Sequence, residues 1–273
     1  MIVQYLNLKL HFDNFSDFNP GKKNIILLHG FTGSVNDWKD VANKIDKRFN
    51  KIAIDLIGHG KTSSPTDLKF YNIDSITDQI EEIIQQIGLK EVILCGYSMG
   101  GRVALNFALS KPQLVRGLIL ESSSAGIKNK NEREKRKISD EELASYINNN
   151  SIEDFVTKWL DQEIFGTIRR FSNEKIKRIK EEKMKNNRTG LANSLRGFGT
   201  GVMPYLGSEL IKLKVPILLI SGGLDEKFTQ INQSLRKLFP SARHKIISTA
   251  GHNVHLEEPK KFVEAVNGLL KKF

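Results

Sequence analysis

One short stretch constrains the fold more than any other feature of the chain: the sequence GYSMG at residues 96–100, with Ser98 at its centre. It follows directly on the apolar run at residues 92–95 and precedes a segment with helical spacing. A strand that enters Gly-x-Ser-x-Gly and continues as a helix is typical of a sharp, strained turn that exposes the serine hydroxyl. The turn is so tight that a side chain at either glycine position would clash with neighbouring atoms. The stretch predicts an activated serine at the edge of a sheet.

Further apolar runs repeat at intervals along the chain and alternate with segments of helical spacing. The runs are rich in Ile, Leu and Val, and we expect buried strands at residues 24–28, 51–55, 91–95, 117–121 and 216–221, with a short one at 244–247. Helices are expected at residues 76–87, 102–110 and 262–270. This alternation favours a mostly parallel sheet in a doubly wound α/β fold. Residues 2–12 alternate between polar and apolar side chains, which predicts an antiparallel edge strand.

Residues 122–205 break this rhythm, because no strand-like run occurs in them. The segment has a helical pattern and carries 17 Lys and Arg against 12 Asp and Glu. We interpret it as a helical cap inserted into a core that comprises residues 1–121 and 206–273. The cap would cover the carboxyl edge of the sheet. Its charged run at residues 128–137 is interpreted as a solvated helix face.

The formal net charge of +11 leaves several classes of partner to consider. Lysine outnumbers arginine more than twofold and is spread over the whole chain, and no nucleic-acid motif accompanies it. We therefore expect no nucleic-acid partner, although a positive field could steer an anionic substrate. No stretch is apolar enough for a membrane span, and no secretory leader is expected at the N-terminus. The single cysteine, Cys95, favours a reducing cytoplasm. A monomer and a small homo-oligomer both remain open.

The residues that can do chemistry follow the predicted strands, and parallel sheets bind their ligands at that edge. Ser98, Asp225 and His252 occur in the order serine, acid, histidine that this arrangement requires. His252 would accept the serine proton, and Asp225 would orient the imidazole and stabilise its cation. Asp55 is a competing acid, interpreted as ordering its own loop. His255 competes for the role of base and is interpreted as a structural hydrogen-bonding residue.

Two backbone N–H groups and one arginine complete the constellation. The N–H groups of Phe31 and Met99 are predicted to form an oxyanion hole. Arg102 lies four residues after Ser98, so one helical turn returns it to the face of the serine. A guanidinium at the mouth of a pocket suits the bidentate recognition of a carboxylate. The alternative is an exposed arginine on the helix surface.

Several motifs together resemble the 2-succinyl-6-hydroxy-2,4-cyclohexadiene-1-carboxylate synthases of menaquinone biosynthesis, which have the α/β-hydrolase fold. The motifs span nearly the whole chain: LHGFTGS at 28–34, GYSMGGR at 96–102, LESSSAGI at 120–127, LANSLRG at 191–197, GLDEKF at 223–228 and AGHNVHLE at 250–257. The resemblance implies an elimination of pyruvate rather than a hydrolysis, with Ser98 removing a ring proton. It implies no cofactor and a small anionic substrate that bears several carboxylates.

The resemblance also implies residues that contact the substrate. Tyr97 and Arg102 match pocket residues of the family, and in the predicted cap Arg136, Trp159 and Phe165 occupy corresponding positions. A further cation is expected before residue 191, where Lys183 and Arg188 are both candidates and we prefer Lys183. The competing interpretations are packing within the cap for the two aromatic residues and a solvated helix face for Arg136.

Three functions therefore compete at this stage. The first is a cofactor-independent lyase that releases pyruvate. The second is a serine hydrolase, either an esterase or a carbon–carbon bond hydrolase, with the same Ser98, Asp225 and His252. The third is a non-catalytic ligand receptor, which would not need to keep all three residues. Arg102 favours the lyase over a simple esterase, because neutral substrates gain nothing from a desolvated cation. No metal site is expected.

Overall fold

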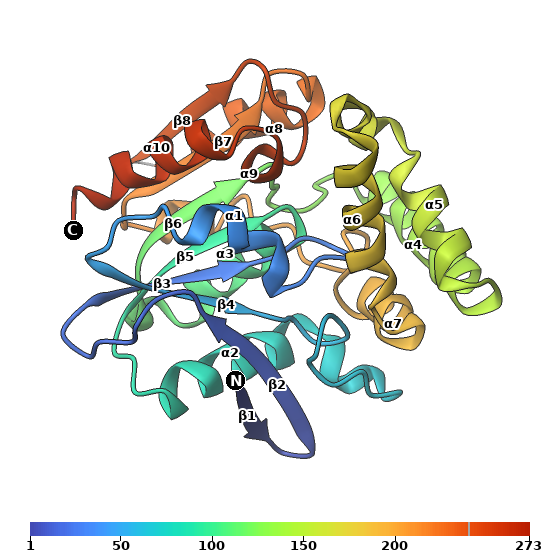
Figure 1. The fold of residues 1–273 in the computed structure, drawn as a ribbon, viewed down its shortest axis with the longest axis horizontal. Coiled ribbons are helices and arrows are strands. Elements are labelled where there is room, and N and C mark those ends of the chain that lie inside the picture. Colours follow the sequence, from blue (N-terminus) through green and yellow to red (C-terminus); the bar gives the residue numbers. More distant parts are fainter. Residues whose placement is uncertain (240) are drawn as a thin grey trace.

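A single eight-stranded sheet forms the centre of the computed structural model, which describes residues 1–239 and 241–273 (Figure 1). The strands lie in the order β1-β2-β4-β3-β5-β6-β7-β8, and every pair from β4 to β8 is parallel. Their bounds are β1 Ile2–Tyr5, β2 Leu8–Asn14, β3 Lys23–Leu28, β4 Phe49–Ile54, β5 Val92–Tyr97, β6 Val115–Glu121, β7 Ile217–Gly222 and β8 Ala242–Ile247. The expected doubly wound α/β fold is confirmed.

The sheet is covered by helices on both faces. One face carries α2 (Ile73–Gln86), α3 (Met99–Ser110) and α8 (Glu226–Leu238), and the other carries α1 (Lys39–Ala42) and α10 (Pro259–Leu270). Ile26 and Leu28 of β3 pack on the first side, whereas Ile25 and Leu27 pack on the second. Successive residues of a strand point to opposite faces, so a strand buried on both sides is apolar throughout. This explains why the runs of Ile, Leu and Val identified these strands.

The N-terminal prediction was wrong in one respect. Residues 2–12 do not form one edge strand but an antiparallel hairpin, in which Val3 pairs with Leu10. The chain turns at Leu6, whose φ of 52° lies in the left-handed region. β2 then pairs antiparallel with β4, so β1 forms the edge of the sheet. A two-residue turn inside an alternating pattern leaves the alternation on both sides intact, and the pattern alone therefore does not reveal it.

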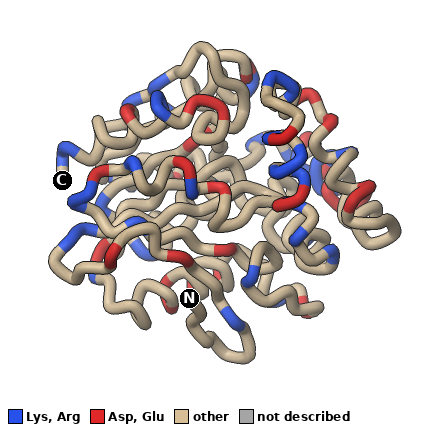
Figure 2. Tube along the Cα trace, in the orientation of Figure 1, with Lys and Arg blue, Asp and Glu red and all other residues tan. Residues whose placement is uncertain are grey.

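Residues 122–205 contain helices and no strand. They are α4 (Lys130–Asn149), α5 (Ile152–Leu160), α6 (Asn173–Met184) and α7 (Arg188–Phe198), with a 3₁₀ segment at Glu163–Arg170. Figure 1 places them together at one side of the sheet. They share a small apolar cluster that includes Ile147, Phe155 and Leu191. Lys and Arg lie all over the molecule, and α4 and α6 carry charges of both signs (Figure 2).

α7 is attached to the core through backbone contacts. Asn186, just before α7, accepts a hydrogen bond from Gly60 N at 2.9 Å and donates one to Thr32 O at 2.9 Å. A Cβ on Gly190 would overlap with the backbone of Gly58, so the two backbones pack so closely that only glycine fits at residue 190. The cap therefore rests on the loops that follow β3 and β4.

None of the helices in the described part of the chain combines the length and the hydrophobicity that a membrane crossing requires. Within those same residues, no three His, Cys, Asp or Glu side chains gather closely enough to hold a metal ion.

Candidate active site

Ser98 stands in a strained turn between β5 and α3. Its φ of 49° and ψ of −106° are unusual for a residue with a side chain. A Cβ on Gly96 or on Gly100 would overlap with neighbouring backbone atoms, so both positions require glycine. The Ser98 N–H donates to the carbonyl of Glu121 on β6 at 2.8 Å. The parallel pairing of β5 with β6 thereby fixes the turn that exposes the hydroxyl.

A chain of hydrogen bonds connects the three residues that the sequence singled out. His252 Nε2 lies 3.2 Å from Ser98 Oγ, and His252 Nδ1 lies 2.6 Å from Asp225 Oδ2. Asp225 Oδ1 accepts a hydrogen bond from Phe228 N, at the start of α8, at 3.1 Å. Asp225 therefore both orients the imidazole and caps a helix, through different oxygens. The two roles of Asp225 are compatible, because each uses a different oxygen.

His252 is almost fully buried, and aromatic rings surround it. The Phe228 ring lies against it edge to face with centroids 4.5 Å apart, and the Tyr97 ring lies 5.4 Å away. The Phe165 ring lies 6.3 Å from it. Phe228 is not among the residues predicted from the sequence. Its signals in the sequence are its place three residues after Asp225 and its membership of the motif GLDEKF at 223–228.

The proposed oxyanion donors lie beside the serine. Met99 is the first residue of α3, so its N–H has no acceptor within the helix. The N-terminus of a helix also favours negative charge. Phe31 follows the end of β3, next to β5 in the sheet, and both residues line the same cavity as Ser98. This is the place at which an anion formed beside Ser98 would need donors.

That cavity lies between the core and the cap and has a volume of about 870 Å³. Such a volume is within the range of small-molecule sites. Its lining brings together all but one of the residues predicted for the site: Phe31, Tyr97, Ser98, Met99, Arg102, Arg136, Trp159, Phe165, Lys183 and His252. The exception, Asp225, lies behind His252. Arg188 is not part of the lining, because its guanidinium donates to Asn150 O at 2.6 Å on the outer surface of the cap.

Arg102 is a partly buried cation that lines this cavity. Its guanidinium donates to the hydroxyl of Thr200, and its Nε is buried without a partner. Burial, and next the nearby guanidinium of Arg136, lower the pKa of Arg102 to about 10. No carboxylate in the described part of the chain forms an ion pair with it. A buried cation without an acid is costly unless an anion joins it.

Lys183 and Arg136 differ in how far their charges are already satisfied. Lys183 Nζ donates to Thr32 Oγ1 at 3.1 Å, and burial lowers the pKa of this amine, an effect that Asp37 opposes. Arg136 Nε instead forms an ion pair with Asp140 at 2.7 Å, and its side chain is 43% exposed. Since Lys183, unlike Arg136, has no carboxylate within ion-pair distance among the described residues, a bound anion would stabilise its charge more.

Thr200, which contacts Arg102, was not predicted from the sequence.

The cap adds aromatic rings to the opposite wall. Trp159 meets Phe31 edge to face with centroids 5.0 Å apart and lies 5.4 Å from Phe165. The indole Nε1 of Trp159 is buried without a hydrogen-bond partner. These rings therefore pack against one another and at the same time line the cavity.

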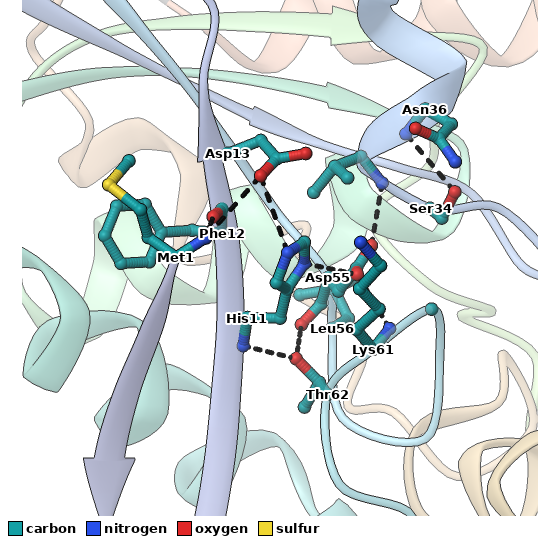
Figure 3. A network of polar contacts seen from close by, with 12 residues as sticks. Met1, His11, Phe12, Asp13, Ser34, Asn36, Asp55, Leu56, Lys61 and Thr62 are labelled. Carbon is teal, nitrogen blue, oxygen red and sulfur yellow. Dashed lines mark hydrogen bonds and ion pairs between the residues drawn. The ribbon is translucent and has the colours of Figure 1, made fainter.

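The competing acid and base have partners of their own. Asp55 accepts hydrogen bonds from His11 Nδ1 at 2.7 Å, Val35 N at 2.7 Å and Lys61 N at 2.8 Å, so it orders its loop as expected (Figure 3). His255 Nδ1 lies 2.7 Å from Glu121 Oε2. Neither residue takes part in the hydrogen-bond chain that ends at Ser98.

Comparisons with known proteins agree with this geometry. Residues 23–259 match the family described as the alpha/beta hydrolase fold. A Bacillus subtilis (strain 168) protein, provisionally named 2-succinyl-6-hydroxy-2,4-cyclohexadiene-1-carboxylate synthase, is 41% identical over 90% of this chain and 89% of its own length. The synthase of that name from Serratia proteamaculans (strain 568) is 28% identical over 90% of this chain and 92% of its own.

Solved structures with similar folds include a MenH protein and several esterases. MenH from S. aureus superimposes with a TM-score of 0.91 and 33% identity, over 96% of this chain and 98% of that one. A thermophilic esterase from Thermogutta terrifontis has a TM-score of 0.84 but 22% identity, over 97% and 94% of the two chains, which shows the shared fold alone. The chain belongs to the α/β-hydrolase fold family and, within it, to the family of the 2-succinyl-6-hydroxy-2,4-cyclohexadiene-1-carboxylate synthases.

Proposed function

We propose that this protein eliminates pyruvate from 2-succinyl-5-enolpyruvyl-6-hydroxy-3-cyclohexene-1-carboxylate in menaquinone (vitamin K2) biosynthesis. The product is 2-succinyl-6-hydroxy-2,4-cyclohexadiene-1-carboxylate, the compound in the names of its relatives. The observation that supports the proposal is Arg102, a partly buried cation in the cavity of Ser98 whose Nε is shielded from water and which forms no ion pair with a carboxylate of the described residues. A substrate with several carboxylates supplies the missing anions. A neutral ester does not.

The hydrogen-bond chain supports a proton abstraction. His252 takes the proton of the Ser98 hydroxyl, and Asp225 stabilises the resulting imidazolium. The serine oxygen then removes the ring proton next to the succinyl ketone. The N–H groups of Phe31 and Met99 hold the enolate oxygen that develops. As the enolate collapses to the diene, the bond to the enolpyruvyl oxygen breaks. The enolpyruvate leaves, and with the abstracted proton it becomes pyruvate.

We infer that the cap, residues 122–205, and the start of α3 bind the anionic groups. Arg102 and Lys183 line the cavity, are partly desolvated and form no ion pair with a carboxylate of the described residues, so they suit the substrate carboxylates. Arg136 shares its charge with Asp140 and adds a weaker contact nearer to solvent. Tyr97, Trp159 and Phe165 pack against the ring and exclude water. The proposal invokes no cofactor, and the partner is a small polycarboxylate.

We place this reaction in the cytoplasm. The single cysteine, Cys95, is fully buried, and the relatives are named as biosynthetic enzymes. Disulfide-bearing proteins of oxidising compartments use cysteine differently.

A parallel assay of two substrates tests the proposal. Purified protein is given the enolpyruvyl cyclohexene acid, and the pyruvate released is coupled to the oxidation of NADH by lactate dehydrogenase. The same preparation is given a nitrophenyl ester. We expect fast pyruvate release and little ester turnover. Fast ester hydrolysis without pyruvate would replace the lyase by the serine hydrolase that the same three residues permit.

A further inference from the structure

A second acid–histidine pair lies close to the proposed catalytic chain, and its histidine, His255, lines the same cavity as Ser98. Glu121, at the end of β6, and His255, in the short helix α9 (Val254–Glu257), are both almost completely buried. Glu121 Oε2 lies 2.7 Å from His255 Nδ1, and Glu121 Oε1 accepts a hydrogen bond from the His255 backbone N–H at 2.9 Å. Both carboxylate oxygens therefore hold one residue, by its ring and by its backbone.

Glu121 also holds the serine turn. Its backbone carbonyl accepts the N–H of Ser98 at 2.8 Å, while its side chain holds His255, three residues after His252. One residue thus joins the turn that carries Ser98 to the loop that carries His252. These two segments are 154 residues apart in sequence, and the distance between Ser98 Oγ and His252 Nε2 depends on how they are joined.

The His255 ring in turn supports the residue next to the serine. It stacks on Trp38 with centroids 4.3 Å apart and meets the Tyr97 ring edge to face at 5.1 Å. Tyr97 itself lies 5.4 Å from the His252 ring. The other ring nitrogen of His255, Nε2, is buried without a partner. The bonds that His255 does make all act on the framework around Ser98 and His252.

We propose that Glu121 and His255 are positioning residues that set the separation of Ser98 from His252. The inference deepens the proposed function, because it concerns the same site. A displacement of about 1 Å at reacting groups can cost about 10²-fold in rate. Loss of the Glu121–His255 bond therefore lowers kcat and leaves KM nearly unchanged, since the groups that bind the substrate carboxylates are untouched.

The chain contains a matched control. His11 and Asp55 are also buried, and His11 Nδ1 lies 2.7 Å from Asp55 Oδ2, but this pair joins β2 to the loop after β4 (Figure 3). Substitution of His11 removes a buried acid–histidine bond of the same length away from Ser98. Its effect on stability without an effect on kcat defines a purely structural role.

The experiment compares Leu and Asn at both histidines. Leucine removes the ring nitrogen, whereas the amide nitrogen of asparagine can still donate from the position of Nδ1. We expect kcat to fall about 10–100-fold in His255→Leu and to stay within about threefold of wild type in His255→Asn. Glu121→Gln, an isosteric change, is expected between them. His11→Leu and His11→Asn are expected to lower Tm and to leave kcat per folded molecule unchanged.

Two readouts do not depend on pyruvate release, and they separate this inference from the proposed function. One is the rate at which a phosphonofluoridate labels Ser98. The other is the downfield proton resonance of the bond between His252 and Asp225. Both are expected to change in His255→Leu and to be restored in His255→Asn, even if the natural substrate were a different one.

Two outcomes would overturn the proposal. If His255→Leu lowers Tm as His11→Leu does but keeps kcat, the labelling rate and the resonance, the pair is structural only. If His255→Asn is folded, shows the wild-type labelling and resonance and yet loses activity as His255→Leu does, the Nε2 atom contacts the substrate. His255 would then be a binding residue rather than a positioning one.

Discussion

The two walls of the cavity differ in how their polar side chains are paired. On the sheet side, Ser98, His252 and Asp225 are hydrogen-bonded to one another before any ligand is present. On the other side, Arg102 and Lys183 are partly buried cations that form no ion pair with a carboxylate among the described residues, and desolvation lowers the pKa of each. The proposed reacting groups are thus hydrogen-bonded to one another, whereas the proposed binding cations form no ion pair among the described residues. Pre-ordered reacting groups favour the transition state, and unsatisfied binding groups give selectivity for charge.

This difference predicts that substitutions in the two walls have different effects on activity, binding and stability. Changes on the sheet side should abolish the reaction with little effect on stability. Changes among the cations should weaken binding and make the folded protein more stable, because a desolvated charge is removed. Each prediction below tests one side of this contrast.

The largest effect is expected for Ser98→Ala. Loss of the hydroxyl removes the base, so pyruvate release should fall by roughly 10⁴-fold or more. Binding of the product, measured by calorimetry, should persist because the cations remain. Ser110→Ala, at the exposed C-terminal end of α3, the helix that begins directly after Ser98, serves as the control. Retention of more than a few per cent of the activity in Ser98→Ala would remove the serine from the mechanism.

Asp225→Asn separates the two roles of one carboxylate. Asparagine still caps α8 through its side-chain oxygen but no longer fixes the imidazole, so kcat should fall by about 10³–10⁴-fold while Tm changes little. Asp67→Asn is the control, because Asp67 caps a 3₁₀ helix through Lys69 N and contacts no histidine. A large drop in Tm with unchanged kcat would show that Asp225 acts only as a helix cap.

Arg102→Met should act in opposite directions on function and stability. We expect kcat/KM to fall by about two orders of magnitude, chiefly through KM, because a substrate carboxylate loses its partner. The free energy of unfolding should rise by about 1 kcal/mol, because methionine removes a partly desolvated charge. Urea denaturation and steady-state kinetics measure the two effects. If Arg102→Met instead lowers the free energy of unfolding, the cation stabilises the fold, and the proposed difference between the two walls is wrong.

The smallest effect concerns the charge of Lys183. Because burial lowers its pKa below the ordinary value of 10.5, the amine loses its proton at a lower pH than a free lysine does. KM should therefore rise by about tenfold as the pH increases toward 10. Lys183→Arg keeps its charge and should delay this rise, whereas Lys177→Arg, on the exposed side of α6, should not. An identical pH profile for all three proteins would exclude Lys183 from binding.

How much of this site could be predicted depends on the range of the interactions. The turn at Ser98 is encoded by adjacent residues, and the strands by their own apolar runs, so both could be read locally. The choice between Lys183 and Arg188 could not, because it depends on which face of the cap meets the core. His255 could be recognised in the sequence as a structural hydrogen-bonding residue, but its partner Glu121 could not be, because only the pairing of distant segments brings the two together.

One buried side chain has a practical consequence for experiments on motion. Cys95, in the middle of β5, is the only thiol of the chain, and burial raises its pKa well above the ordinary value. A thiol of this kind resists alkylating dyes, which react with exposed thiolates. A cysteine introduced at an exposed position of α6 would therefore accept a fluorophore alone. Opening and closing of the cap could be followed in real time without first removing a native cysteine.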